Sequence, residues 1–180
     1  MTKVQKMKSP VVIAVVGGKN SGKTTTIEAL IRELTKKGYK IAVVKHISEP
    51  NFTIDTAGKD TWRFAQSGAE TIISVASNEI ATIEKVKARN FSLEEILQKC
   101  KGQDIVFLEG FREFVSRKKD IHKIVVVRSA KEVAEAAKNF EPILAFTGPY
   151  STEKLNLKVP HADALKNPEK IADIVEKVVV

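Results

Sequence analysis

The sequence predicts an α/β fold of three layers, in which helices cover both faces of a mostly parallel sheet. Short continuous apolar runs recur along the 180 residues, and helical patterns lie between several of them. Such runs are typical of strands buried on both faces of a sheet. Strands that alternate with helices indicate parallel strands joined by right-handed crossovers. The length suits a single domain over residues 1–180.

Six apolar runs are the predicted strands. They are VVIAVV from Val11, IAVV from Ile41, IISVA from Ile72, IVFL from Ile105, IVVV from Ile124 and ILAF from Ile143. The run from Ile72 is followed by a second strand-like run after only Ser77, Asn78 and Glu79. This spacing is too short for a crossover helix, so an antiparallel hairpin is expected from Ile72 to Val86.

Four helices are predicted from their ends and apolar faces. The first ends at Gly38 and carries an apolar stripe of Ile27, Leu30, Ile31 and Leu34. Two more open with a serine followed three residues later by a glutamate, which is the capping-box pattern: Ser92 with Glu95, and Ser129 with Glu132. The last has Asn167 as its cap and Pro168 as its first residue.

Composition limits the classes of function. No apolar stretch approaches the roughly 20 residues that cross a bilayer. The opening MTKVQKMKSP has no small-residue cleavage site, so a cytoplasmic location is expected. The net charge of +8 favours anionic partners, but aromatic residues are only 6% of the chain and none is interleaved with a basic run. A base-stacking platform for nucleic acid is therefore not supported.

The stretch VVGGKNSGKTTT contains the strongest motif. Gly17, Gly22, Lys23 and Thr24 match G-x-x-x-x-G-K-[ST], with a predicted strand before the motif and an amphipathic helix after it. In such a phosphate loop the backbone N–H groups face phosphate oxygens, the lysine reaches the β- and γ-phosphates, and the threonine hydroxyl meets Mg²⁺. The motif predicts a P-loop NTPase fold and a nucleoside triphosphate ligand. The predicted binding residues are Gly17, Gly18, Lys19, Asn20, Ser21, Gly22, Lys23, Thr24 and Thr25.

A phosphate loop needs an acidic partner for the metal. Glu109 stands at the carboxyl end of the strand from Ile105, where ligands meet open α/β sheets, and is the predicted acid. Aspartate is usual there, so direct coordination and coordination through water both stay open. Asp104 enters the same strand at its other end and is expected at the surface. Arg112 is either a phosphate contact or an exposed arginine.

A second polar segment follows the strand from Ile41. Lys45 and His46 are expected at the same sheet edge as the phosphate loop, with His46 more simply explained as a structural residue than as a catalyst. Asp55 is a second candidate for the Mg²⁺ shell. Asp60 either belongs to a functional loop or caps a short helix. The stretch FTGPY after the last strand either lines a base pocket or forms a plain turn.

The segments GGKNSGKTTT, VVKH, IDTAGKDTWRFAQSGA and FLEGFRE, in this order, resemble the molybdopterin-guanine dinucleotide biosynthesis adapter protein B (MobB) family. The resemblance implies a GTP-binding P-loop protein, a weak Mg²⁺-dependent GTPase that forms homodimers and works beside the nucleotidyltransferase that attaches GMP to molybdopterin. It supports the phosphate loop, with Lys23 and Glu109 as the catalytic residues. It also marks motif positions of open role, which are Lys45, His46, Asp55, Gly58, Lys59 and Asp60. The hairpin is the expected place for strand pairing between the two copies.

Two other classes of function compete with an adapter GTPase. A small-molecule kinase would bind ATP in the same loop and an acceptor between His46 and Arg63, but an arginine-rich lid is not evident. A non-catalytic module for nucleic acid or a phosphorylated cofactor would fit the charge but not the aromatic content. An N-K-x-D signature for guanine is also not found, so guanine preference rests on the resemblance.

Overall fold

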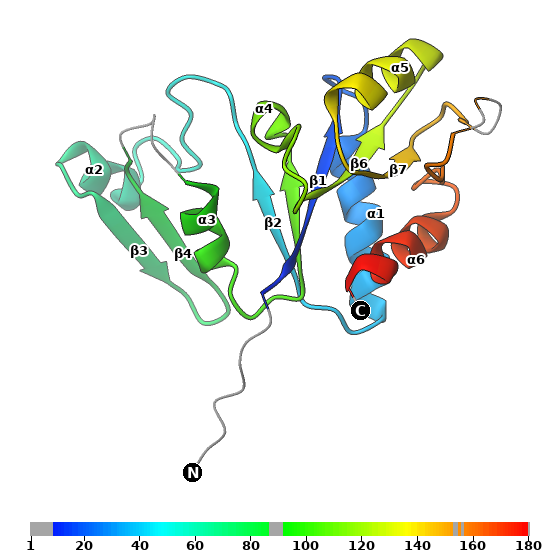
Figure 1. Ribbon diagram of the computed structural model, residues 1–180. Coiled ribbons are helices and arrows are strands. Elements are labelled where there is room, and N and C mark those ends of the chain that lie inside the picture. The colour runs from blue at the N-terminus through cyan, green and yellow to red at the C-terminus, as the bar shows by residue number, and fades with distance from the viewer. Residues whose placement is uncertain (1–8, 87–91, 153–154, 156, 180) are drawn as a thin grey trace. The chain divides into compact units, whose positions relative to one another are not determined.

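The computed structural model describes residues 9–86, 92–152, 155 and 157–179, so most of the basic N-terminal segment lies outside the described residues. The chain divides into two compact units. The first comprises Met1–His46 and Leu97–Val180, and the second comprises Ile47–Ile96. The larger unit holds a five-stranded sheet and the smaller one a two-stranded sheet (Figure 1). A single domain over the whole chain stays a prediction.

The helices and strands alternate along most of the chain. In order they are β1 (Val11–Gly17), α1 (Lys23–Lys36), β2 (Ile41–Lys45), α2 (Asp60–Gln66), β3 (Thr71–Val75), β4 (Ile80–Glu84), α3 (Leu93–Lys99), β5 (Ile105–Glu109), α4 (Arg112–Val115), β6 (His122–Val126), α5 (Ala130–Asn139), β7 (Ile143–Thr147) and α6 (Pro168–Val179). All the predicted strands and helices are present. The two short helices α2 and α4 flank the loops that the sequence marked as functional.

The five-stranded sheet has the order β2-β5-β1-β6-β7, and all its neighbouring strands are parallel. β1 is central, with β5 on one side and β6 on the other. The register pairs Val15 with Glu109 of β5 and Gly17 with Val126 of β6. The phosphate loop, the predicted acid and the end of β6 therefore meet at one edge of the sheet. The predicted α/β class with a mostly parallel sheet and an antiparallel pair is confirmed.

The sheet separates two layers of apolar packing. Ile13 and Val15 of β1 belong to a core shared with α1 and α6, which lie side by side (Figure 1). Ala14 and Val16 are equally buried and, because side chains alternate along a strand, point to the other face. Complete burial of β1 on both faces explains its continuous apolar sequence and fixes the position of the loop that follows it.

The helix ends follow the predicted signals. In α1 the predicted stripe is buried or partly buried, and the helix begins directly after the glycine of the phosphate loop. The capping box before α3 is reciprocal: Glu95 N donates to Ser92 Oγ at 3.0 Å and Ser92 N donates to Glu95 Oε2 at 3.2 Å. Cys100, directly after α3, is buried.

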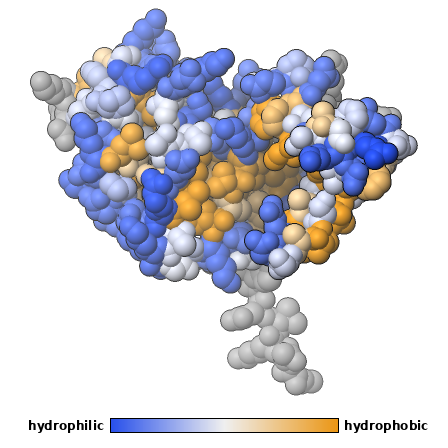
Figure 2. Space-filling model, turned by 180° about the vertical axis from the view of Figure 1, so that it is seen from behind, coloured by the Kyte–Doolittle hydropathy of each residue, from blue (hydrophilic) through white to orange (hydrophobic). Residues whose placement is uncertain are grey.

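The second unit contains the predicted hairpin. β3 and β4 pair antiparallel, with Ile72 opposite Ile83 and Val75 opposite Ile80. Ile72 is buried, whereas Ile73, Val75 and Ile80 are 61%, 75% and 70% exposed. Apolar patches are visible among hydrophilic ones on the molecular surface in Figure 2. These three large aliphatic side chains form an exposed apolar face on the hairpin, a feature that often marks an interaction site.

Candidate nucleotide site

The phosphate loop runs from the end of β1 to the first turn of α1 and needs glycine at two places for different reasons. Gly22 has φ 97°, a backbone conformation that side chains disfavour, and serves as the N-cap of α1. A Cβ at Gly17 would lie 2.7 Å from Ser21 Oγ and 2.9 Å from the Val126 carbonyl oxygen. The loop is thus closed tightly against β6, while Thr26 N donates to the Gly22 carbonyl to begin the helix.

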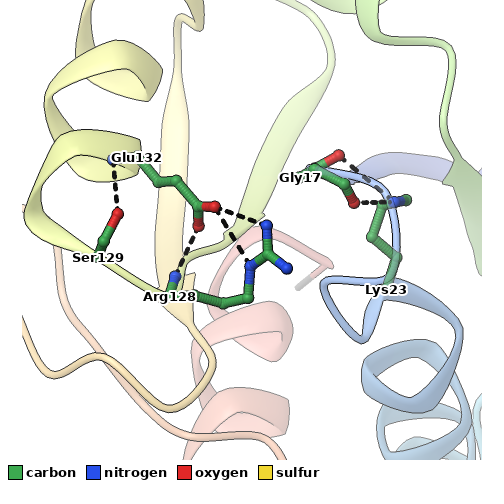
Figure 3. Close-up of polar contacts among 6 residues, drawn as sticks. Gly17, Lys23, Arg128, Ser129 and Glu132 are labelled. Carbon is green, nitrogen blue, oxygen red and sulfur yellow. Dashed lines mark hydrogen bonds and ion pairs between the residues drawn. The ribbon is translucent and has the colours of Figure 1, made fainter.

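Lys23 folds back over the start of this loop. Its Nζ donates to the Gly18 carbonyl at 2.7 Å and to the Gly17 carbonyl at 3.3 Å (Figure 3). Burial lowers the pKa of Lys23, and the charges of Lys45 and Arg128 lower it further, against the opposing effect of Glu109. An anion bound in the loop would oppose these effects, because it favours the charged form of Lys23.

Glu109 lies beside the hydroxyl predicted to meet the metal. Thr24 Oγ1 donates to Glu109 Oε1 at 2.9 Å, and Lys45 Nζ lies 3.3 Å from the same oxygen. The Glu109 side chain is 10% exposed, so its charge is held at a nearly buried site. Lys45 comes from the end of β2 and is half exposed. The sequence predicted that these strand ends share one edge, and the geometry brings the three side chains together.

The turn after β5 has an uncommon backbone. Gly110 and Phe111 have φ 88° and 51°, and a positive φ at a bulky residue is strained. His46 stabilises this turn, because its N–H donates to the Glu109 carbonyl at 3.0 Å and its ring packs 5.2 Å from that of Phe111. These contacts account for His46 as a structural residue, which is the interpretation the sequence favoured. Gly110 also approaches His46 closely, since a Cβ there would lie 3.4 Å from His46 Cβ.

The segment with Asp55 lies in the second unit. Asp55 Oδ1 accepts from Thr56 N and from Thr61 Oγ1, both at 2.8 Å, and Oδ2 is buried and unpartnered within the described structure. This carboxylate organises its own loop, and its place in a metal shell stays a prediction. Gly58 precedes α2 with φ 86°.

The interpretation of Asp60 as a helix cap is wrong. Lys59 is the N-cap of α2, without a side-chain cap bond, and Asp60 is the first helical residue. In this first turn, the negative charge of Asp60 interacts favourably with the positive end of the helix dipole. Asp60 also forms an exposed 3.5 Å ion pair with Arg63.

Three further expectations concern the edges of the site. Asp104 is exposed and accepts from Lys40 N at 2.7 Å, as a surface residue should. Arg112 is exposed and its guanidinium lies over the Phe140 ring at 5.2 Å, beside a cavity that also borders Gly17 and Gly18. Gly148 in FTGPY packs so closely against β6 that a Cβ would lie 2.6 Å from the Val127 carbonyl, which explains the turn as a packing feature.

The sequence did not single out Arg128 and Glu132, although both border the loop. Arg128 follows β6, and a Cβ on Gly18 would lie 3.1 Å from its Nη2 and 3.9 Å from Glu132 Oε1. The sequence signal that could have identified Arg128 is its position shortly after β6, the strand that neighbours β1 in the sheet. The sequence assigned Glu132 only to the cap of α5, where Glu132 N does donate to Ser129 Oγ at 3.3 Å.

The donor set fits a divalent cation held together with phosphate. Hydroxyl and carboxylate oxygens are ligands that Mg²⁺ accepts, and Mg²⁺ in nucleotide sites relies on one or two protein ligands plus phosphate and water. Thr24 and Glu109 offer such a pair. The described residues hold no group of three His, Cys, Asp or Glu side chains suited to binding a metal by themselves. In that part of the chain, none of the helices has both the length and the apolar character to cross a bilayer.

Comparison with protein families decides the relationship. The family model for molybdopterin guanine dinucleotide synthesis protein B, MobB, matches residues 12–148. The chain belongs to the MobB family. This range contains the phosphate loop, Lys45, Glu109 and Arg128, so the whole edge described above lies within the part that MobB proteins share.

Individual relatives agree with this assignment. The chain is 31% identical over 125 residues to the molybdopterin-guanine dinucleotide biosynthesis adapter protein of Haemophilus influenzae, covering 68% of this chain and 69% of that protein. It is 25% identical over 119 residues to the adapter protein of Escherichia coli, covering 64% and 65%. The crystal structure of Bacillus subtilis MobB superposes with a TM-score of 0.68 at 24% identity, over 92% of this chain and 96% of that one. The last comparison shows that the MobB fold is shared.

Proposed function

We propose that this chain is a GTP-binding adapter of molybdopterin guanine dinucleotide biosynthesis that hydrolyses GTP slowly with Mg²⁺. The observation that carries the proposal is the meeting of Lys23, Thr24 and Glu109 at the carboxyl edge of the parallel sheet. The lysine is poised at the loop, and the hydroxyl and carboxylate already face one another. Membership of the MobB family supports the adapter role, and the family resemblance supports guanine as the base.

Each residue has a distinct part in this proposal. The loop N–H groups and the positive end of α1 bind phosphate oxygens, and Lys23 moves from the loop carbonyls to the β- and γ-phosphates. Thr24 and Glu109 hold Mg²⁺, directly or through water. A Mg²⁺ ion held by these two side chains would supply positive charge that offsets the charge developing during phosphoryl transfer. Slow turnover is consistent with the absence of an evident water-activating residue in the sequence motifs.

The proposal includes two partners. A second copy of the chain pairs through the exposed face of the hairpin, and the nucleotidyltransferase that attaches GMP to molybdopterin receives the nucleotide-dependent signal. Both partners are inferred from the family resemblance. The exposed apolar face formed by Ile73, Val75 and Ile80 supports pairing with a second copy. The cytoplasmic location stays a prediction.

A competition titration tests the base and the ligand class. A fluorescent triphosphate bound with Mg²⁺ is displaced by GTP or by ATP, with the Lys23→Ala variant as the control for binding at the loop. Preference for GTP that is lost in the variant supports the adapter GTPase. Preference for ATP would favour the small-molecule kinase instead, and equal weak binding to wild type and Lys23→Ala would overturn the site itself.

A further inference from the structure

Arg128 carries a positive charge at the rim of the phosphate loop, outside the motif. It follows β6, whose residue Val126 pairs with Gly17, so the chain brings Arg128 alongside Gly18. A Cβ built on Gly18 would lie 3.1 Å from Arg128 Nη2. Figure 3 shows the guanidinium between Glu132 and the start of the loop. A Cβ at position 18 would therefore require the guanidinium to shift slightly.

Glu132 holds this guanidinium in place. Its Oε1 accepts from Arg128 Nη2 at 2.8 Å and from Nε at 3.2 Å, and its Oε2 accepts from the Arg128 backbone N at 2.7 Å. In a reciprocal capping box this carboxylate would instead reach back to Ser129 N. These hydrogen bonds from Arg128 lower the pKa of Glu132, which keeps the carboxylate charged. The remaining guanidinium N–H groups stay available for a second acceptor.

The position of Arg128 indicates which part of a bound nucleotide it would contact. Lys23 Nζ lies on the Gly17 and Gly18 carbonyls, and a lysine in this motif serves the β- and γ-phosphates. Arg128 borders Gly18 as well, so the two cations lie at the same end of the loop. The charge of Arg128 is also among the influences that lower the pKa of Lys23, after burial and the charge of Lys45. Two mutually repelling cations held at one end of an anion-binding loop are stabilised when anionic oxygens lie between them.

We propose that Arg128 is an additional phosphate-binding residue that contacts the β- or γ-phosphate of the bound nucleotide, and that Glu132 is its positioning residue. This inference rests on the proposed nucleotide site. Arginine is suited to the role because its planar fork binds phosphate oxygens while it keeps a second pair of bonds to a carboxylate. Since the fold already orders the side chain, less entropy is lost when the ligand binds. The pair Arg128 and Glu132 therefore distinguishes nucleoside triphosphates from monophosphates.

The test compares the affinities for GTP and GMP, each with Mg²⁺, by isothermal titration calorimetry. Arg128→Gln is expected to weaken GTP binding about tenfold to a hundredfold, as expected for loss of a hydrogen bond to a charged group, and to leave GMP binding unchanged. Glu132→Gln is expected to lower the ratio of GTP to GMP affinity in the same direction but less, because a neutral acceptor holds the guanidinium more weakly. The matched control is Arg117→Gln, since Arg117 is an exposed arginine that donates to the Lys138 carbonyl. It should leave both affinities unchanged.

Several outcomes would contradict the inference. If Arg128→Gln binds GTP as tightly as wild type while Lys23→Ala does not, the site stands and the role of Arg128 is overturned. If Arg128→Gln weakens GTP and GMP equally, Arg128 serves the α-phosphate, ribose or base, and the assignment to the β- or γ-phosphate is wrong. If wild type binds neither nucleotide, the proposed function fails together with the inference. Thermal unfolding of each variant checks the fold, which should persist because the pair is partly exposed.

Discussion

Thr24 Oγ1 lies 2.9 Å from Glu109 Oε1, which links the first turn of α1 to the end of β5 across 85 positions of sequence. The hydroxyl donates and the carboxylate accepts, so each side chain holds the other in place. Lys45 approaches the same carboxylate oxygen from β2. A metal ion bound at this point would compete with these two contacts of Glu109.

Glu109→Gln is expected to lower Mg²⁺-dependent GTP hydrolysis more than GTP binding. The amide keeps the shape of the side chain and can still accept from Thr24, but it lacks the charge that holds Mg²⁺. Steady-state phosphate release and nucleotide affinity, each measured over a range of Mg²⁺ concentrations, check this. Asp104→Asn is the matched control, since Asp104 is a carboxylate at the opposite end of the same strand and contacts Lys40 N. Hydrolysis by Glu109→Gln equal to wild type would overturn the metal role of Glu109.

Much of this edge could be predicted from the sequence, because motif spacing and the apolar character of the strands are local signals. The strand before Gly17 and the strand before Glu109 are both continuous apolar runs, and their carboxyl ends meet once the strands are parallel neighbours. The contact between Lys45 and Glu109 could not be predicted in the same way, because the sequence does not show that β5 lies between β1 and β2 in the sheet.

Other parts could not be predicted for identifiable reasons. Phe111 adopts a positive φ that its residue type disfavours, because its buried ring and the contact of His46 with the turn outweigh the local preference. Glu132 matched a capping box, yet its carboxylate turns to Arg128, which offers three donors instead of one. Whether a carboxylate caps its own helix or pairs with a neighbouring charge depends on three-dimensional geometry. The spacing of residues in the sequence does not determine this geometry.

The affinity for triphosphate is expected to fall as pH rises into the alkaline range. The pKa of Lys23 in the ligand-free protein lies below the ordinary 10.5, mainly because of burial, and the bound phosphates favour its charged form. Binding therefore takes up a proton once pH exceeds the lowered pKa, and affinity is lost as pH rises through it. Calorimetry from neutral to alkaline pH measures this loss. Lys23→Arg is the control, because arginine stays charged over the whole range and any fall that persists belongs to another group.

Gly148→Ala is expected to destabilise the fold more than Gly38→Ala. Both glycines have positive φ, 106° and 91°, so each alanine has a backbone cost of about 1–2 kcal/mol. At Gly148 the new Cβ would also lie 2.6 Å from the Val127 carbonyl, whereas nothing lies within 4 Å at Gly38. Crowding of this kind adds about 1–3 kcal/mol. Urea unfolding of the two variants measures the difference, and equal losses would show that the turn after β7 can move away from β6.

Ile73→Lys is expected to convert a dimer of this chain into a monomer. Ile73 and Val75 share one face of β3, and across the hairpin Val75 pairs with Ile80. All three are more than half exposed, so a buried partner surface would remove substantial apolar area from water, and a charge in its centre would oppose burial. Ser74→Lys is the matched control, because Ser74 is an exposed neighbour on the opposite face of the same strand. Light scattering after size-exclusion chromatography gives the masses. If the wild-type chain is a monomer, the proposed dimer through the hairpin is wrong. If Ser74→Lys dissociates the dimer and Ile73→Lys does not, the interface lies on the other face of the hairpin.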